Sequence, residues 1–86
     1  MKKVVMFSLD TCPYCDRAIK MVEALKQKNP KYRDVKIEII DEDNRPEEYQ
    51  DLTHELVPAY YVDGIEVFNG VPNFKLIEEV LKKSIN

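Results

Sequence analysis

The pattern of apolar and polar residues predicts four short β-strands. Residues 3–7 are mainly apolar and β-branched, which is typical of a strand buried on both faces. Residues 35–40 alternate apolar and polar side chains, which predicts a strand with one wetter face. Residues 59–62 and 65–68 flank Asp63-Gly64, a pair favoured in tight hairpin turns, so these two strands are expected to be antiparallel neighbours.

Other stretches of the chain predict helices. From residue 15 to about residue 28, apolar residues recur at three- and four-residue steps, which indicates an amphipathic helix. Pro13 suits the first turn of this helix, where a missing N–H costs no hydrogen bond. A short polar helix is expected over residues 46–54, and a last amphipathic helix is expected after Asn73.

The order of these elements is strand, helix, strand, helix, strand, strand, helix, and it predicts an α/β fold. The strand-helix-strand start implies a right-handed parallel crossover, and the hairpin then adds an antiparallel pair to the same sheet. We therefore expect a four-stranded mixed sheet covered by helices on both faces. At 86 residues and 10.1 kDa, the chain fits a single domain over residues 1–86.

Composition and charge narrow the classes of partner. Hydrophobic residues make up 44% of the chain and charged residues 34%, a balance typical of a folded domain. The net charge is −3 and no basic patch is dense enough to neutralise phosphates, so nucleic acid is not expected as a partner. No apolar run approaches the ~20 residues that span a bilayer, and none near the N-terminus has the length of a secretory signal. We therefore expect a cytoplasmic protein with no membrane partner.

The only cysteines, Cys12 and Cys15, lie where the first strand gives way to the first helix, and they carry the candidate chemistry. With Cys12 at the helix N-cap, its sulfur would face unpaired backbone N–H groups and the positive end of the helix dipole, which stabilise a thiolate. Cys15 follows three residues later, close enough to attack a mixed disulfide formed at Cys12. The spacing predicts a redox pair with Cys12 as the nucleophile and Cys15 as the resolving thiol.

Other uses of these cysteines match the sequence less well. A structural zinc site needs about four ligands, and the chain offers two cysteines and His54, so a second subunit would have to complete it. A purely structural disulfide would close a very small loop and contribute little stability. A non-catalytic interaction domain would leave Cys12 with the reactivity of a free thiol. His54 is not assigned to the site, because exchange at a stabilised thiolate needs no histidine base, and the acidic residues 41–43 predict a solvated turn.

The Cys-Pro-Tyr-Cys motif at residues 12–15, and Val57-Pro58 before the predicted hairpin, resemble the motifs of dithiol glutaredoxins in the thioredoxin-fold superfamily. The resemblance covers essentially the whole chain and implies a thioredoxin fold. In that family the corresponding proline peptide is cis, lies against the cysteines and leaves the preceding backbone free to pair with substrate, roles that fall to Pro58 and Val57. Pro13 and Tyr14 are then expected to contact substrate, although a tyrosine in a first helical turn can also simply cover apolar surface.

The chain departs from the glutathione-using glutaredoxins at three places. Leu9 stands where they usually carry a lysine, and Leu56 stands where they carry a threonine. Residues 68–73 contain one glycine and no carboxylate, where those proteins have a glycine pair followed by acidic residues. Asp10 and Asp16 further weaken the attraction for the carboxylates of glutathione.

Two cations of the first helix bear on the choice of electron donor. Arg17 and Lys20 could compensate for the missing lysine, or they could form an ordinary solvated face with Glu23. Some glutaredoxin-like proteins are reduced by a thioredoxin reductase instead. The electron donor is therefore left open between glutathione and a thioredoxin reductase.

Together these observations predict a glutaredoxin-like thiol-disulfide oxidoreductase that reduces disulfides in proteins or small molecules. Its catalytic residues are Cys12 and Cys15, and its substrate contacts are Pro13, Tyr14, Val57 and Pro58. No tightly bound cofactor or metal is expected, glutathione is considered only as a reductant, and a monomer is the default. The alternative is a protein that holds a metal or an iron-sulfur cluster between two subunits. Pro13 argues against it, since the glutaredoxins that resemble cluster carriers usually have a small residue there.

Overall fold

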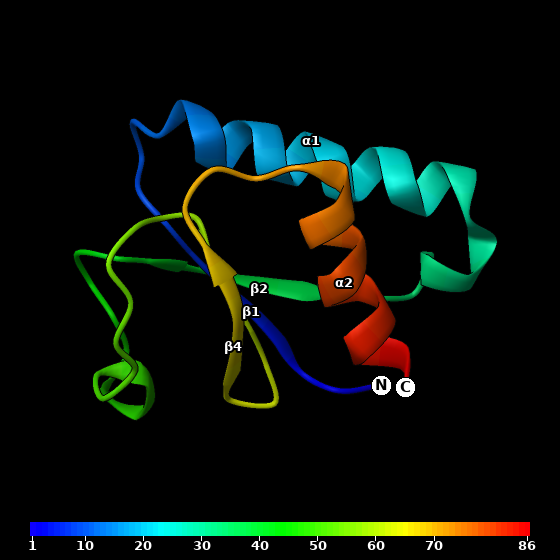
Figure 1. The fold of residues 1–86 in the computed structure, drawn as a ribbon. Helices are drawn as coiled ribbons and strands as arrows, with labels where there is room; N and C mark the ends of the chain where they lie inside the picture. Colours follow the sequence, from blue (N-terminus) through cyan, green and yellow to red (C-terminus); the bar gives the residue numbers. More distant parts are fainter.

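The computed structural model describes residues 1–86 of the protein (Figure 1). Its strands and helices are β1 (Val4–Ser8), α1 (Pro13–Lys28), β2 (Ile37–Asp41), β3 (Ala59–Val62), β4 (Ile65–Asn69) and α2 (Phe74–Ile85). Two short 3-10 turns, η1 (Pro30–Tyr32) and η2 (Glu47–Tyr49), lie in the connections. None of the helices combines the length and the apolar character that crossing a membrane requires.

The four strands form one mixed sheet in the order β2-β1-β3-β4. β1 runs parallel to β2 and antiparallel to β3, and β3 and β4 form the predicted hairpin. In this register Met6 lies between Ile39 of β2 and Tyr60 of β3. The hairpin turns at Asp63 and Gly64, whose φ values of 51° and 80° are the left-handed conformation of a tight two-residue turn. The predicted four-stranded mixed sheet is confirmed.

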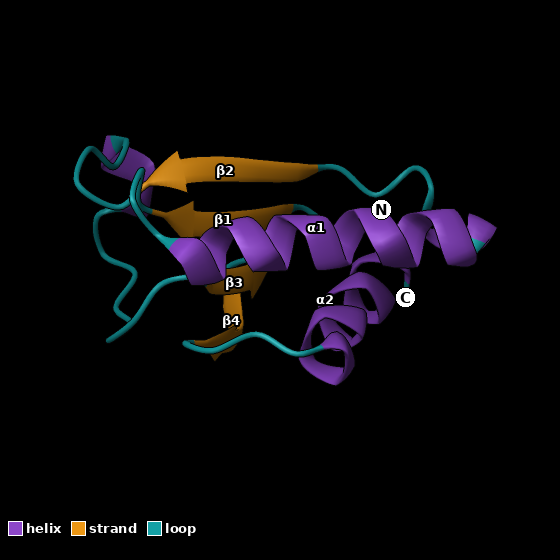
Figure 2. Ribbon diagram, turned by 90° about the horizontal axis from the view of Figure 1, so that it is seen from above, coloured by secondary structure: helices purple, strands orange, loops and turns teal.

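Both α-helices pack on one face of this sheet, and the main hydrophobic core lies beneath them. Figure 2 shows α1 crossing in front of the strands with α2 beside it. The strands contribute Val4, Met6, Tyr60 and Val62 to this core, and the helices contribute Ala18, Val22, Leu25, Ile77, Val80 and Leu81. The apolar side of α1 is thus buried along its length, which holds the first turn of the helix, with its cysteines, in a fixed place.

The opposite face of the sheet has no α-helix, and in this detail the prediction was wrong. Its buried strand residues, Val5, Phe7, Ile40, Ala59 and Tyr61, are covered by Tyr49 and Leu52. Of the helix predicted over residues 46–54, only the turn η2 forms. The segment has few apolar side chains, and a short helix without a packed apolar side is unstable. Arg45 also donates hydrogen bonds to the carbonyl oxygens of Tyr49 and Leu52, which helps to stabilise the irregular path of this segment.

Candidate active site

Cys12 and Cys15 lie at the junction of β1 and α1, as predicted. Cys12 is the N-cap of α1, with an extended backbone at φ −124° and ψ 97°. Its Sγ accepts a hydrogen bond of 3.1 Å from the backbone N–H of Cys15. Pro13 occupies the first helical turn, where its missing N–H leaves no hydrogen bond unmade. In the reduced protein, the first N–H groups of α1 and the helix dipole would stabilise a thiolate at Cys12.

The two cysteines are joined in a disulfide, so the structure shows the oxidised form. Their Cα atoms are 5.1 Å apart, a usual separation for a disulfide. Cys15 is completely buried, whereas Cys12 is partly exposed. A disulfide of another molecule can therefore reach the sulfur of Cys12 and not that of Cys15, which supports the predicted order of attack.

The segment before β3 reaches the same end of the sheet. Ala59, the first residue of β3, pairs with Phe7, so Pro58 comes level with the end of β1. The Val57–Pro58 peptide is cis, as the resemblance implied. Pro58 is fully buried, Val57 is half-buried, and the carbonyl oxygen of Pro58 accepts a 3.0 Å hydrogen bond from the N–H of Gly70.

Exposed apolar side chains belong to the three segments that meet at this end of the molecule. Tyr14 in α1, Leu56 before the cis peptide and Val71 after β4 are 43%, 57% and 61% exposed. Leu56 lies against Gly70, since a Cβ atom at Gly70 would come within 3.2 Å of Leu56 Cδ1. The side chains expected to contact substrate between the cysteines, Pro13 and Tyr14, are both exposed.

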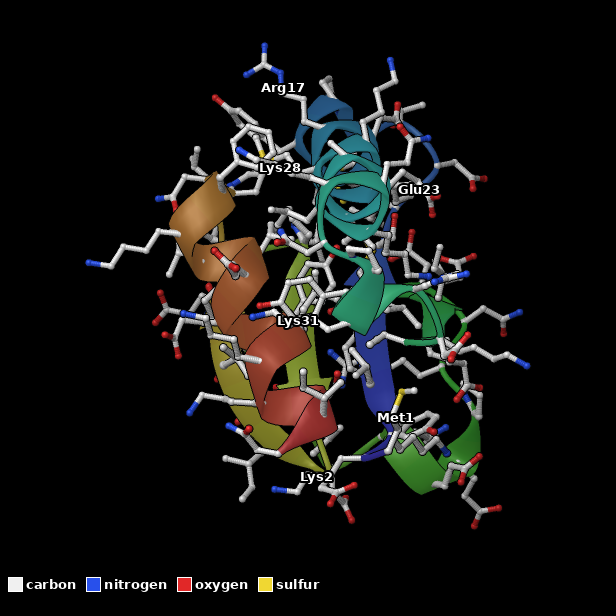
Figure 3. All side chains as sticks on the ribbon, turned by 90° about the vertical axis from the view of Figure 1, so that its right-hand side faces the viewer. Met1, Lys2, Arg17, Glu23, Lys28 and Lys31 are labelled. Atoms are coloured by element: carbon white, nitrogen blue, oxygen red, sulfur yellow. A yellow bond between two sulfur atoms is a disulfide. The ribbon has the colours of Figure 1, made fainter.

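Arg17 lies beside Tyr14 and not beside Glu23. The centre of its guanidinium group is 5.4 Å from the centroid of the Tyr14 ring. Figure 3, seen from the C-terminal end of α1, shows Arg17 and Glu23 projecting to different sides of the helix. Arg17 therefore adds one positive charge next to the cysteine motif.

Comparison with known proteins decides the family. A family model described as "Thioredoxin domain" matches residues 1–82. The chain belongs to the thioredoxin-domain family. Among its relatives, a "Probable Thioredoxin" of Methanothermobacter marburgensis is 32% identical over 84 residues, covering 96% of this chain and 95% of the relative. A "Thioredoxin" of Methanocaldococcus jannaschii is 26% identical over 83 residues, with the same coverage of 96% and 95%.

Membership of the thioredoxin-domain family confirms the predicted superfamily. Together with the Cys12–Cys15 disulfide, it makes this chain a thiol-disulfide oxidoreductase. The narrower glutaredoxin type stays a prediction. No group of three or more histidine, cysteine, aspartate or glutamate side chains is arranged to hold a metal ion, so the alternative of a metal or cluster site would need ligands from a second subunit.

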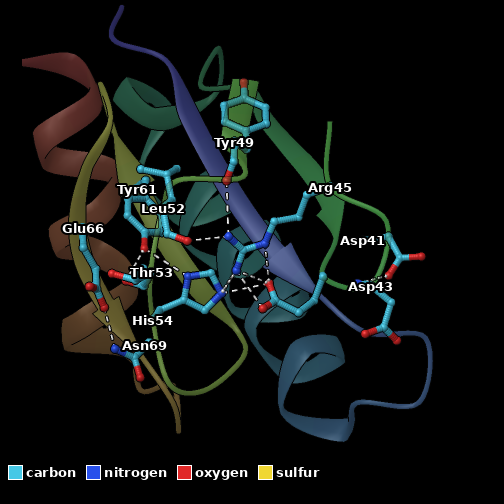
Figure 4. Close-up of polar contacts among 11 residues, drawn as sticks. Asp41, Asp43, Arg45, Tyr49, Leu52, Thr53, His54, Tyr61, Glu66 and Asn69 are labelled. Carbon is cyan, nitrogen blue, oxygen red and sulfur yellow. Dashed lines mark hydrogen bonds and ion pairs between the residues drawn. The ribbon is translucent and has the colours of Figure 1, made fainter. Parts of the chain in front are cut away.

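The thioredoxin domain also contains a group of polar side chains outside the cysteine site, on the face of the sheet opposite the helices (Figure 4). It consists of Glu42, Arg45, His54 and Tyr61, and we call it the Arg45 cluster. Arg45 Nη2 lies 2.8 Å from Glu42 Oε2, and His54 Nε2 lies 2.9 Å from Glu42 Oε1. His54 Nδ1 lies 3.0 Å from the hydroxyl oxygen of Tyr61. Burial alone would raise the pKa of Glu42, but the hydrogen bonds from Arg45 and His54 outweigh it and hold this pKa below its usual value.

Few features of the sequence indicated the Arg45 cluster. The prediction that residues 41–43 form a solvated turn is wrong for Glu42, which is paired and only 24% exposed at its side chain. The one signal was the combination of a single arginine and a single histidine in a polar connection that follows an acidic run. That pattern is common on protein surfaces, so it did not distinguish a partly buried ion pair from solvated charges.

Proposed function

We propose that this thioredoxin-domain protein is a dithiol reductase of protein disulfides, and that it receives its electrons from a thioredoxin reductase and not from glutathione. The observation that carries the proposal is the disulfide between a partly exposed sulfur at the helix N-cap and a completely buried one. A pair with this asymmetry can attack, and then release, another molecule's disulfide in a fixed order.

In the first step, the Cys12 thiolate attacks one sulfur of the substrate disulfide. The substrate S–S bond breaks, one substrate sulfur leaves as a thiolate that takes up a proton, and Cys12 is joined to the other sulfur. In the second step, the Cys15 thiolate attacks Cys12 Sγ and releases the second substrate thiol. The substrate has gained two electrons and two protons, and the Cys12–Cys15 disulfide awaits reduction.

The choice of electron donor rests on three features of the chain and on the names of two relatives. Leu9 stands where glutathione-using glutaredoxins carry a lysine, and residues 68–73 lack a carboxylate that could receive the amino end of glutathione. Asp10 and Asp16 are both exposed beside the cysteine motif and repel carboxylates, while Arg17 offers a single opposing charge. The two relatives described above carry the name thioredoxin.

Protein substrates are proposed to meet the exposed Pro13 and Tyr14 on one side and the Val57–Pro58 segment on the other. An extended substrate segment would pair with the backbone of Val57 while its sulfur faces Cys12, in the manner of strand addition. Such a reaction suits a reducing compartment, and the cytoplasm remains our prediction for its location.

Coupled assays test the proposal. The oxidised protein is mixed with NADPH and either thioredoxin reductase or glutathione plus glutathione reductase, insulin is added as the disulfide substrate, and NADPH loss is followed. We expect turnover with thioredoxin reductase and none above background with glutathione. Turnover with glutathione alone would reverse the donor assignment, and activity with neither would contradict the proposed reaction.

Cysteine variants test the assigned roles. Cys12→Ser is expected to abolish turnover, and Cys15→Ser is expected to trap a mixed disulfide with the substrate on Cys12. Non-reducing electrophoresis followed by mass spectrometry detects the trapped species. A Cys15→Ser protein that reduces protein disulfides at the wild-type rate would contradict the roles.

A further inference from the structure

The Arg45 cluster takes no part in the thiol chemistry, yet it fixes the segment that leads to Val57 and Pro58. Residues 50–58 contain no helix or strand, and no hydrogen bond between backbone groups involves residues 53–57. Such a segment keeps its path only through its own side chains and through side chains that bind its carbonyl groups. The Arg45 cluster supplies these contacts.

Arg45 makes most of the contacts that hold this segment. Its Nη1 atom donates to the carbonyl oxygen of Tyr49 at 3.2 Å and also to that of Leu52. Its Nη2 atom lies 2.9 and 2.8 Å from the two carboxylate oxygens of Glu42. The guanidinium group lies over the ring of Phe7, 4.7 Å from the ring centroid. The Arg45 side chain is only 15% exposed, and charge-assisted hydrogen bonds are strong in such surroundings.

His54 and Tyr61 hold the residues that follow. The hydroxyl of Tyr61 donates a 3.0 Å hydrogen bond to the carbonyl oxygen of Thr53. The His54 side chain is 1% exposed, and its ring centroid lies 4.9 Å from that of Phe7. Because a carboxylate oxygen only accepts, the Nε2 atom of His54 carries the hydrogen of its bond to Glu42. The chain at His54 is thus fixed three residues before Val57.

The same cluster is tied to the strand that leads to Cys12. The backbone N–H of Glu42 donates a 2.8 Å hydrogen bond to the carbonyl oxygen of Ser8, the last residue of β1. Phe7, which lies under Arg45 and His54, is the residue before it. The cluster therefore connects the two segments of the site, one leading to the attacking sulfur and the other leading to Val57.

Building on the proposed function, we propose that Arg45 is a positioning residue for protein substrates. Through Glu42 and the carbonyl groups it binds, it holds the backbone of Val57 where an extended substrate segment can pair with it. Reduction of a protein disulfide depends on this pairing, whereas a small disulfide needs only the sulfur of Cys12. Loss of Arg45 therefore slows the reduction of protein disulfides and leaves the reduction of small disulfides nearly unchanged. A general loss of stability would slow both reactions.

The test compares two substrates of the reduced protein, insulin and the small aromatic disulfide 5,5′-dithiobis-(2-nitrobenzoate). For Arg45→Met, we expect the rate constant with insulin to fall roughly tenfold or more and that with the small disulfide to stay within about twofold of wild type. Arg45→Lys keeps the charge without the planar fork and should give an intermediate insulin rate. Arg33→Met removes an exposed arginine beside η1 and is the matched control, with both rates as in wild type.

A double variant tests whether an unpaired carboxylate at Glu42 causes the change in rate. Arg45→Met leaves Glu42 without its cation, so the double variant Glu42→Gln/Arg45→Met repeats the comparison with no unpaired carboxylate. Circular dichroism and urea unfolding identify the variants that are folded under the assay conditions. Equal falls in both rate constants, or an unchanged insulin rate, in the folded variants would overturn the positioning role. Failure of the wild-type protein to reduce insulin would instead count against the proposed function.

Discussion

The backbone N–H of Gly70 donates a hydrogen bond of 3.0 Å to the carbonyl oxygen of Pro58. This bond joins the loop after β4 to the cis peptide, and Gly70 makes it with a φ of +100°, in the left-handed region that favours glycine. An added Cβ atom would also come within 3.2 Å of Leu56 Cδ1. We therefore expect Gly70→Ala to lower the free energy of unfolding by about 1–3 kcal/mol, measured by urea unfolding.

Gly64→Ala is the matched control for this substitution. Gly64 has a φ of +80°, but no heavy atom lies within 4 Å of the position of an added Cβ atom. Its alanine variant shares the backbone strain without the contact to Leu56, so Gly70→Ala should be the less stable of the two. If both variants lost the same free energy of unfolding, Leu56 would have moved aside without cost. The double variant Gly70→Ala/Leu56→Ala would then be no more stable than expected from its two single substitutions.

The reduced protein should react with alkylating agents at one cysteine only. Cys12 is partly exposed at the N-cap of α1, whereas Cys15 is completely buried. With a limited amount of iodoacetamide, mass spectrometry of peptides should find the label on Cys12. The rate of labelling should reach half its maximum at a pH below the ~8.5 of a free cysteine. Labelling of Cys15 at a comparable rate would contradict the geometry of the site.

Lowering the pH should reduce the free energy of unfolding partly through protonation of Glu42. Hydrogen bonds from Arg45 and His54 outweigh burial and hold the pKa of Glu42 below its ordinary value of 4.5 in the folded state. The carboxylate therefore contributes stability in full above the pKa of the unfolded chain, and this contribution is lost as the pH falls through the folded-state pKa. In urea unfolding, the difference in stability between wild type and Glu42→Gln should be constant at neutral pH and shrink as the pH is lowered below 4.5. A difference that does not change with pH would contradict this.

Tyr32 should stabilise the fold through its hydroxyl group. That hydroxyl donates a 2.9 Å hydrogen bond to Glu78 of α2, and burial together with this bond raises the pKa of Tyr32 to about 12. Tyr32→Phe should lower the free energy of unfolding by about 1 kcal/mol at neutral pH. Tyr14→Phe, at an exposed ring, is the control and should be close to neutral. In wild type the contribution of Tyr32 is present below the ordinary pKa of 10.0 and declines as the pH rises toward 12.

The sequence predicted best those features that depend on local patterns. The amphipathic spacing located α1 and α2, and Asp63-Gly64 located the hairpin, because these signals follow directly from helix and turn geometry. The N-cap position of Cys12 followed from the same logic. The cis geometry of the Val57–Pro58 peptide could be expected only from a family resemblance, since most X-Pro bonds are trans.

Features that depend on contacts between distant segments were predicted poorly. β2 begins at Ile37 and not at residue 35, because the N–H of Val35 donates its hydrogen bond to the carbonyl oxygen of Tyr32, in the turn after η1, and not to a neighbouring strand. The helix expected over residues 46–54 gave way to an irregular segment held by Arg45. The charge pattern alone could not show that Glu42 and His54 meet, since 12 residues separate them in the chain.

The two α-helices cover one face of the sheet, and an irregular segment covers the other. The cysteine motif and the Val57–Pro58 segment therefore differ in their resistance to local unfolding. Cys12 and Cys15 are anchored by a long helix over the main core, whereas Val57 ends a stretch that lacks backbone hydrogen bonds. Local unfolding is cheapest where few backbone bonds and few apolar contacts are lost. Opening of the stretch that ends at Val57 is therefore limited by the side chains of the Arg45 cluster, whereas the sulfur of Cys12 is held by the packing of α1.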